Sequence, residues 1–167
     1  MTSTPKLPKD PTEIAQLLSS SEEEKKELGY QAFLGRTHWH PNADAEDLKI
    51  MACRQLGIAP GKVITSNVKR IEPRLLWASQ SGLEADKLNM VEIAYQHVKK
   101  NGDQLPPIVV WNFFDNQKIR KVIHDGHHRA YFSYRLNIKL RAVILEPLGN
   151  YEEVLHKFRY AFQISKR

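Results

Sequence analysis

The spacing of apolar residues changes along the chain and separates a helical part from a mixed part. Before residue 60 the apolar residues recur every three or four positions, which is typical of amphipathic helices. This pattern predicts helices over 12–18, 21–28 and 43–56. We expect Thr12 to cap the first helix and Ser21, three residues before Glu24, to open the second with a capping box. The Gly, Pro and Asn residues of 35–42 predict a loop.

After residue 60, β-branched and continuous apolar runs alternate with helical spacing. Strands are predicted over 62–71, 106–114, 119–123 and 141–145, and helices over 90–100, from 127 or 128 to 136, and over 151–165. The stretch 74–89 fits neither period, although Ser81-Gly82 indicates a turn within it. The run PPIVVWNFF lacks polar alternation, so its strand is expected at the centre of a sheet with both faces buried. Residues 115–117 are expected to form a hairpin turn.

These elements predict an α/β (α+β) fold in which helices flank a small mixed sheet. We divide the chain into a disordered lead (1–11), an N-terminal helical arm (12–60) and one α/β domain (61–167). A chain of 167 residues is long enough to bury a substantial core. The arm either packs on that core or mediates formation of a homodimer, and the pattern favours neither.

Charge and composition narrow the class of partner. The formal net charge of +6 favours contact with phosphate-bearing molecules. A single cysteine, Cys53, excludes a disulfide framework and a cysteine-based zinc site, and fits a cytoplasmic setting. We expect no signal peptide and no membrane partner, because no apolar run approaches the roughly 20 residues that span a bilayer.

The stretch IHDGHHRAY, residues 123–131, carries the most chemistry. An apolar strand is expected to end before it, Gly126 to turn the backbone, and a helix to begin at His127 or His128. The first N–H groups of a helix lack internal partners and carry partial positive charge, so they attract anions. Arg129 adds a planar cation that matches phosphate oxygens. Together these features indicate a phosphate site.

Two other interpretations of the same residues remain open. In the first, Asp125 caps the helix, Arg129 pairs with a carboxylate and the histidines only pack. In the second, His124, Asp125, His127 and His128 bind a transition metal. Strand geometry argues against the second, because it directs His124 away from the others. The His38-Trp39-His40 sequence, with Asp44 nearby, is interpreted as a surface loop in preference to a metal site.

The segment LPPIVVWNFFDNQKIRKVIHDGHHRAYFSYRLNIKLRAVIL resembles the core of the ParB/sulfiredoxin superfamily. The likeness covers residues 62–146: a PIVV-type strand, a hairpin, a Gly-x-x-Arg turn, a helix and a short strand. His127 stands where sulfiredoxin has its catalytic cysteine, so sulfinic-acid reduction is not expected. His127 and His128 replace the Glu and first Arg of the partition proteins. The stretch after residue 146 is too short for their helix-turn-helix domain.

The Asp-Gly-His-His-Arg spelling most resembles the ParB-like nuclease proteins and the ADP-dependent free-serine kinases of this fold. The resemblance implies that Gly126, His127, His128 and Arg129 hold the phosphates of ATP, ADP or another nucleotide. It also places Asp125 at the chemistry, where it would hold Mg²⁺ or accept a proton. An upstream glutamate would assist as base, and Glu72 and Glu84 are the two candidates.

We therefore expect a nucleotide-binding protein that hydrolyses the nucleotide or transfers its phosphoryl group. The alternative is a ParB-like module that binds or cleaves DNA without small-molecule kinase activity. Its contacts would come from two basic clusters, Lys69 with Arg70, and Lys118 with Arg120 and Lys121. The phosphate acceptor is not evident from the sequence.

Overall fold

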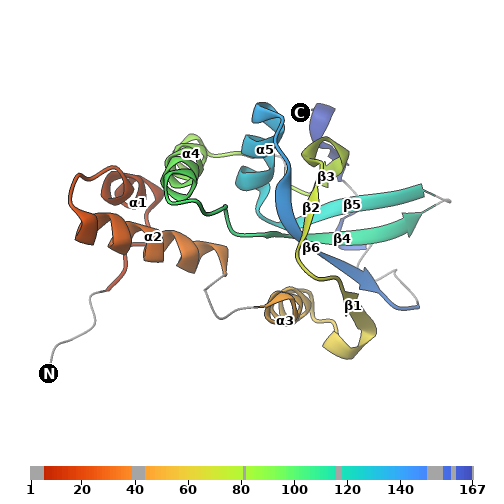
Figure 1. Ribbon diagram of the computed structural model, residues 1–167. Coiled ribbons are helices and arrows are strands. Elements are labelled where there is room, and N and C mark those ends of the chain that lie inside the picture. The colour runs from red at the N-terminus through yellow and green to blue at the C-terminus, as the bar shows by residue number, and fades with distance from the viewer. Residues whose placement is uncertain are drawn as a thin grey trace, which may run out of the picture.

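The computed structural model describes residues 6–38, 44–80, 82–115, 118–149, 156–158 and 161–166. These residues form a mixed α/β structure, so the expected fold class is confirmed (Figure 1). The helices are α1 (Pro11–Leu18), α2 (Glu23–Thr37), α3 (Ala45–Leu56), α4 (Ala85–Lys100) and α5 (His127–Leu136). Among the described residues, no helix combines the length and apolar character needed to cross a membrane.

The strands form one mixed sheet. They are β1 (Val63–Thr65), β2 (Lys69–Ile71), β3 (Leu76–Ala78), β4 (Ile108–Asp115), β5 (Lys118–Asp125), β6 (Leu140–Pro147) and β7 (Phe162–Gln163). The order is β1-β6-β4-β5-β3-β7, and β2 pairs with β6 beside β1. β4 is parallel to β6 and antiparallel to β5. The predicted central position of the PPIVVWNFF strand is confirmed.

Side chains of β4 alternate between two cores because successive residues of a strand face opposite sides of the sheet. Val109, Trp111 and Phe113 pack in one cluster with Leu48 and Ala52 of α3. On the other face, Ile108 and Val110 cluster with Ala130 of α5. Figure 1 shows α3 and α5 on opposite sides of the sheet. The two helices therefore bury the strand on both faces.

The first two helices contact the rest of the protein through α4. Ile14 and Leu18 of α1, Phe33 of α2, and Val91 and Ala94 of α4 form a third buried cluster. Gly29 lets α1 and α2 approach closely, because a Cβ atom there would lie 2.8 Å from the Leu17 Cβ and 2.9 Å from the Leu18 backbone nitrogen. The segment predicted as an arm thus packs on the domain through α1 and α2, while α3 contributes to the core of the sheet.

The predicted start of the first helix is wrong, whereas its predicted end at Leu18 is confirmed; both the predicted start and the predicted end of the second helix are wrong. α1 begins at Pro11 with Asp10 as its N-cap, because the Asp10 carboxylate accepts the Glu13 N–H at 3.1 Å and proline suits the first helical position. α2 is capped by Glu22 without the predicted Ser21 capping box. It continues to Thr37 instead of ending at residue 28, because packing on α1 and α4 outweighs the cost of its glycines. The predicted 35–42 loop is therefore helical at 35–37.

Two further predictions need correction, and the structure assigns the stretch that fitted neither period. The 62–71 strand is two short strands, β1 and β2, joined by residues that hydrogen-bond to β6 through Ser66. The ambiguous 74–89 stretch contains β3 and the first turn of α4, which starts at Ala85. The predicted 151–165 helix is wrong at residues 162–165, where β7 pairs with β3 and a 3₁₀ turn (Ile164–Lys166) follows. Without β7, β3 would be an edge strand with unpaired backbone groups, and the pairing with β7 satisfies those groups. Residues 151–155 lie outside the described residues.

Gly29 and Gly35, two glycines of α2, provide a matched test of the α1–α2 contact. We expect Gly29→Ala to lower the free energy of unfolding by about 1–3 kcal/mol, because the added methyl group meets the α1 backbone. Gly35→Ala should raise it by about 0.5–1 kcal/mol, because nothing lies within 4 Å of the new methyl group and alanine favours the helix. Urea unfolding measures both, and changes of the same sign would contradict the packing described.

Candidate functional site

Gly126 forms the turn between β5 and α5 that the sequence predicted. It is the N-cap residue of α5 and has a φ of 103°, in the left-handed region that favours glycine. A Cβ atom at this position would collide with the Cγ2 of Ile108, and would lie 2.8 Å from the Ile108 Cβ and 3.1 Å from Arg129 Nη2. Both the backbone conformation and the space therefore require glycine here.

Arg129 is buried and held by three hydrogen bonds. Its Nη1 donates to the carbonyl oxygens of Pro106 and Pro107, both at 2.9 Å, and its Nη2 donates to Asp125 Oδ2 at 3.2 Å. Burial lowers the pKa of the guanidinium, and the charge of Asp125 opposes that shift. These contacts match the interpretation in which Arg129 pairs with a carboxylate, and they give it a structural role in addition to any role in binding.

The two histidines of the motif have defined partners. His127 is buried, and its Nε2 accepts the backbone N–H of Ser79 at 3.1 Å. The Ser79 hydroxyl donates its proton to the Ile123 carbonyl at 2.6 Å. The hydroxyl oxygen also lies 3.1 Å from His127 Nε2, but its proton is not directed at that nitrogen. His128 Nε2 accepts the N–H of Glu84 at 3.1 Å. Both rings are therefore oriented by backbone groups, which favours neutral imidazoles with the proton on Nδ1.

All five residues of the Asp-Gly-His-His-Arg motif line one cavity of about 190 Å³. Its opposite wall comes from α2 and α4, which contribute Arg36, Thr37 and Lys87. Arg36 is held in place because its Nη1 donates to the Lys9 carbonyl at 2.7 Å. The N-terminus of α5 therefore opens into a cavity whose walls include Arg36, Lys87 and Arg129 as cations and Asp125 as a carboxylate.

The α2 and α4 residues of this wall were missed by sequence reasoning. Arg36 lies in a stretch predicted to be a loop, and Lys87 in the stretch that fitted neither period. No local signal links them to residues 125–129, because the contact arises only when α1 and α2 pack on α4. Gln80, which also lines the cavity, follows β3, a strand that the sequence did not predict.

His124 belongs to a different network from the motif histidines. Its Nδ1 accepts the indole N–H of the buried Trp111 at 3.0 Å, and its Nε2 lies 2.6 Å from Gln55 Oε1 on α3. Among the described residues, no group of three or more His, Cys, Asp or Glu side chains could hold a metal ion. The described part of the chain therefore does not support the transition-metal interpretation of residues 124–128. Of the His38-Trp39-His40 sequence, only His38 is described.

The structure distinguishes the two candidate glutamates by position. Glu84 precedes α4, its N–H contacts His128, and its carboxylate pairs with Lys87 of the cavity wall. Glu72 is paired with Lys139 at 3.8 Å and does not line the cavity. Only Glu84 is brought next to the motif.

The basic clusters proposed for DNA lie apart in the sheet. Lys69 and Arg70 are on β2, at an edge, and β6 and β4 separate them from Arg120 and Lys121 on β5. At about 4.8 Å per strand, this separation is roughly 14 Å across the sheet. The guanidinium of Arg120 stacks over the Trp77 ring at 4.5 Å. The Lys118 side chain lies outside the described residues.

The His124 network predicts a pH dependence of stability. Burial lowers the pKa of the His124 imidazole in the folded protein; Asp125 opposes this shift, and His38 adds a smaller lowering effect. The unfolded chain therefore binds a proton more readily, so this contribution to stability is complete above pH of about 6.5 and declines as the pH falls below it.

His124→Gln keeps an acceptor for the Trp111 indole but does not titrate. In urea unfolding between pH 5 and 8, we expect the advantage of the wild type over this variant to shrink as the pH falls. An advantage that is constant with pH would contradict a neutral, buried His124.

Comparison of the chain with protein-family models, with curated proteins and with solved structures found no match. The structure brings Asp125, Gly126, His127, His128 and Arg129 together at a helix N-terminus, and it adds Arg36 and Lys87 to them.

Proposed function

We propose that the cavity at the N-terminus of α5 binds the phosphates of a nucleotide and that the protein hydrolyses this nucleotide or transfers its phosphoryl group. The observation that carries the proposal is the convergence of a helix N-terminus, a glycine turn and the cations Arg36 and Lys87 on one cavity. Each of these features favours negative charge for an independent physical reason.

The size of the cavity supports phosphate binding more than enclosure of a whole nucleotide. Small-molecule pockets usually measure about 300–1,000 Å³, whereas this cavity is about 190 Å³. A diphosphate or triphosphate would occupy it, and the nucleoside would lie at its mouth. ATP and ADP are the nucleotides we favour, with other bases open to test.

Asp125 is the residue we assign to the chemistry. Its carboxylate is 31% exposed, lines the cavity and is held by Arg129 Nη2. A carboxylate next to bound phosphates suits Mg²⁺, which prefers oxygen ligands and would neutralise charge on the transferred group. Alternatively, Asp125 would accept a proton from the attacking oxygen. Glu84 is the second carboxylate we consider, because its backbone N–H donates to His128 and its carboxylate pairs with Lys87 of the cavity wall.

The likeness to the ParB/sulfiredoxin superfamily supports the same proposal, because its Gly-x-x-Arg turn is the part of the sequence that carries the resemblance. The structure changes the expected role of one residue. Since Arg129 is committed to two proline carbonyls and to Asp125, we propose that it positions Asp125 and the turn, and that Arg36 and Lys87 supply accessible charge to the phosphates.

Nucleotide binding is tested by thermal shift and calorimetry with ATP, ADP, CTP and inorganic pyrophosphate, each with Mg²⁺. We expect at least one of them to raise the melting temperature, because a ligand that binds only the folded state stabilises it. Lys87→Gln should weaken binding about five- to tenfold through loss of one charge contact. Lys100→Gln removes an exposed charge from the same helix outside the cavity and should bind normally.

Arg129→Ala is a poor test of binding, because it would leave buried carbonyl groups without their donor and destabilise the fold. If none of the four probes shifts the melting temperature at about 5 mM, a concentration that would reveal even weak millimolar binding, the proposal fails.

Catalysis is tested separately with Asp125→Asn, which preserves the shape of the side chain. We expect this variant to keep nucleotide binding within about threefold and to lose at least about 100-fold in the rate of phosphate release or transfer, as expected for loss of a general base or metal ligand. Release of inorganic phosphate, with and without added hydroxyl acceptors, distinguishes hydrolysis from transfer. An unchanged rate would remove Asp125 from the chemistry.

A further inference from the structure

A second and larger cavity, of about 420 Å³, lies between α4, α5, β6 and the segment before β4. This second cavity shares only one lining residue, Arg129, with the phosphate cavity, which is the proposed phosphate site at the N-terminus of α5. Its volume falls within the range of about 300–1,000 Å³ that small-molecule sites occupy. It is therefore a separate space of sufficient size for a ligand, and the inference drawn from it does not depend on the proposed nucleotide activity.

The charge on its walls is strongly one-sided. Among the described residues that line the cavity, one carries a carboxylate, Asp103, and five are cationic: Arg70, Lys99, Arg129, Lys139 and Arg141. The carboxylate already has partners, because it accepts the hydroxyl of Tyr30 and faces Arg141. Two of the cations also have carboxylate partners outside this cavity, Arg129 with Asp125 at 3.2 Å and Lys139 with Glu72 at 3.8 Å. The five cations therefore exceed the three carboxylates near them, and an anion that enters the cavity would meet net positive charge.

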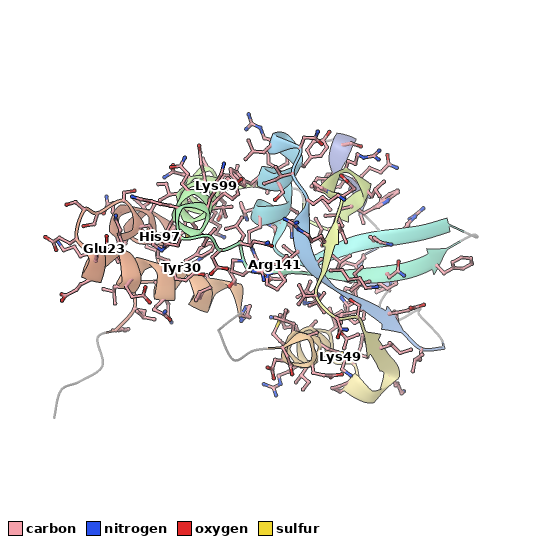
Figure 2. The ribbon with its side chains drawn as sticks, viewed as in Figure 1. Glu23, Tyr30, Lys49, His97, Lys99 and Arg141 are labelled. Carbon is pink, nitrogen blue, oxygen red and sulfur yellow. The ribbon has the colours of Figure 1, made fainter. Side chains whose placement is uncertain are left out.

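Part of this charge is held rigidly. Arg141 donates from Nη2 to the Leu105 carbonyl at 2.8 Å and from Nε to the same oxygen at 3.2 Å. Figure 2 shows Arg141 on β6 and Lys99 on α4, on two of the elements that enclose the cavity. Ser133 of α5, which is only 1% exposed, also lines the cavity. Two arginines and a buried hydroxyl are thus fixed before any ligand binds, which reduces the entropy cost of binding.

The rest of the wall is apolar. Leu105, Pro106, Ile138 and Leu140 line the cavity together with the ring of Tyr95. An inorganic anion would leave this surface in contact with water, whereas a ligand with an apolar body would cover it. The combination of an apolar wall and fixed cations therefore selects for a molecule that is both anionic and apolar.

We propose that this second cavity binds a small organic carboxylate with an aromatic or aliphatic body. The carboxylate would lie near Lys99, Lys139 and Arg141, and the body would lie against the apolar wall. Arginine and lysine side chains both bind carboxylates through charge-assisted hydrogen bonds, and apolar burial adds affinity without demanding an exact shape. The class of ligand is therefore defined by charge and apolar surface together.

The test uses 2-naphthoate as the probe and 2-naphthamide, its neutral counterpart of nearly the same shape. The intact chain, labelled with ¹⁵N, is titrated with each probe by NMR. We expect 2-naphthoate to shift the amide signals of residues 103–105 and 138–141, and to bind at least about tenfold more tightly than 2-naphthamide, which is the effect of one strong charge contact.

Variants then locate the charge. Lys99 and Lys139 are both exposed, so Lys99→Gln/Lys139→Gln should fold normally and weaken 2-naphthoate binding about fivefold or more, while 2-naphthamide binding stays the same. Lys25→Gln/Lys62→Gln removes the same number of charges outside the cavity and should leave both unchanged.

Four results would overturn the proposal: no shifts at about 5 mM probe, equal binding of the two probes, shifts that map outside the second cavity, or full affinity in the Lys99/Lys139 variant. Loss of nucleotide binding has no bearing on any of them, because the two cavities share only Arg129.

Discussion

Two arginines hold four consecutive backbone carbonyls in front of the central strand. Arg141 donates to the carbonyls of Gln104 and Leu105, and Arg129 to those of Pro106 and Pro107. The two prolines cannot donate hydrogen bonds, so side-chain donors satisfy a segment that does not pair as a strand. The clamped segment connects the end of α4 to β4, and the clamp links it to α5 through Arg129 and to β6 through Arg141. Both cavities lie beside it.

The clamp also explains how the motif arginine can serve structure and site together. Nη1 of Arg129 faces the proline carbonyls, whereas Nη2 faces Asp125 at the edge of the cavity at the N-terminus of α5. Gly126 makes this arrangement possible, because a side chain at that position would meet both Ile108 and Arg129. Removing the glycine or the arginine would therefore disturb the fold and the site at once, and functional tests are better placed on Lys87 and Asp125.

The N-terminal helices are also linked to the clamp. Asp103 interacts with the hydroxyl of Tyr30 on α2 and with the charge of Arg141, so polar interactions link α2 to the clamp in addition to the cluster of Phe33 and Val91. Figure 2 shows Tyr30 of α2 near His97 of α4. Their ring centroids are 5.2 Å apart. α2 also contributes Arg36 to the cavity at the N-terminus of α5. All the walls of that cavity are therefore present only when α1 and α2 are packed on α4.

Local sequence determined the elements whose signals are short-range. The continuous apolar run of β4, the glycine turn at Gly126 and the Asp44 and Gly57 ends of α3 each depend on neighbouring residues, and a period of two or 3.6 is visible without knowledge of the fold. The α/β class follows from those signals. The local motif likewise brought Asp125 and residues 126–129 together, because one turn and one helix start are enough to do so.

Only the tertiary structure decided the rest. Four features depend on contacts between distant parts of the chain: the extension of α2 to Thr37, the pairing of β7 with β3, the position of Glu84 rather than Glu72 beside the motif, and the presence of Arg36 and Lys87 in the cavity. Such contacts outweigh local propensities of about 1 kcal/mol per residue, and they leave no periodic trace. The structural role of Arg129 was invisible in the sequence for the same reason. Arg129 donates to the carbonyls of Pro106 and Pro107, which are 22 or more residues away, and this contact forms only when β4 and α5 are packed together.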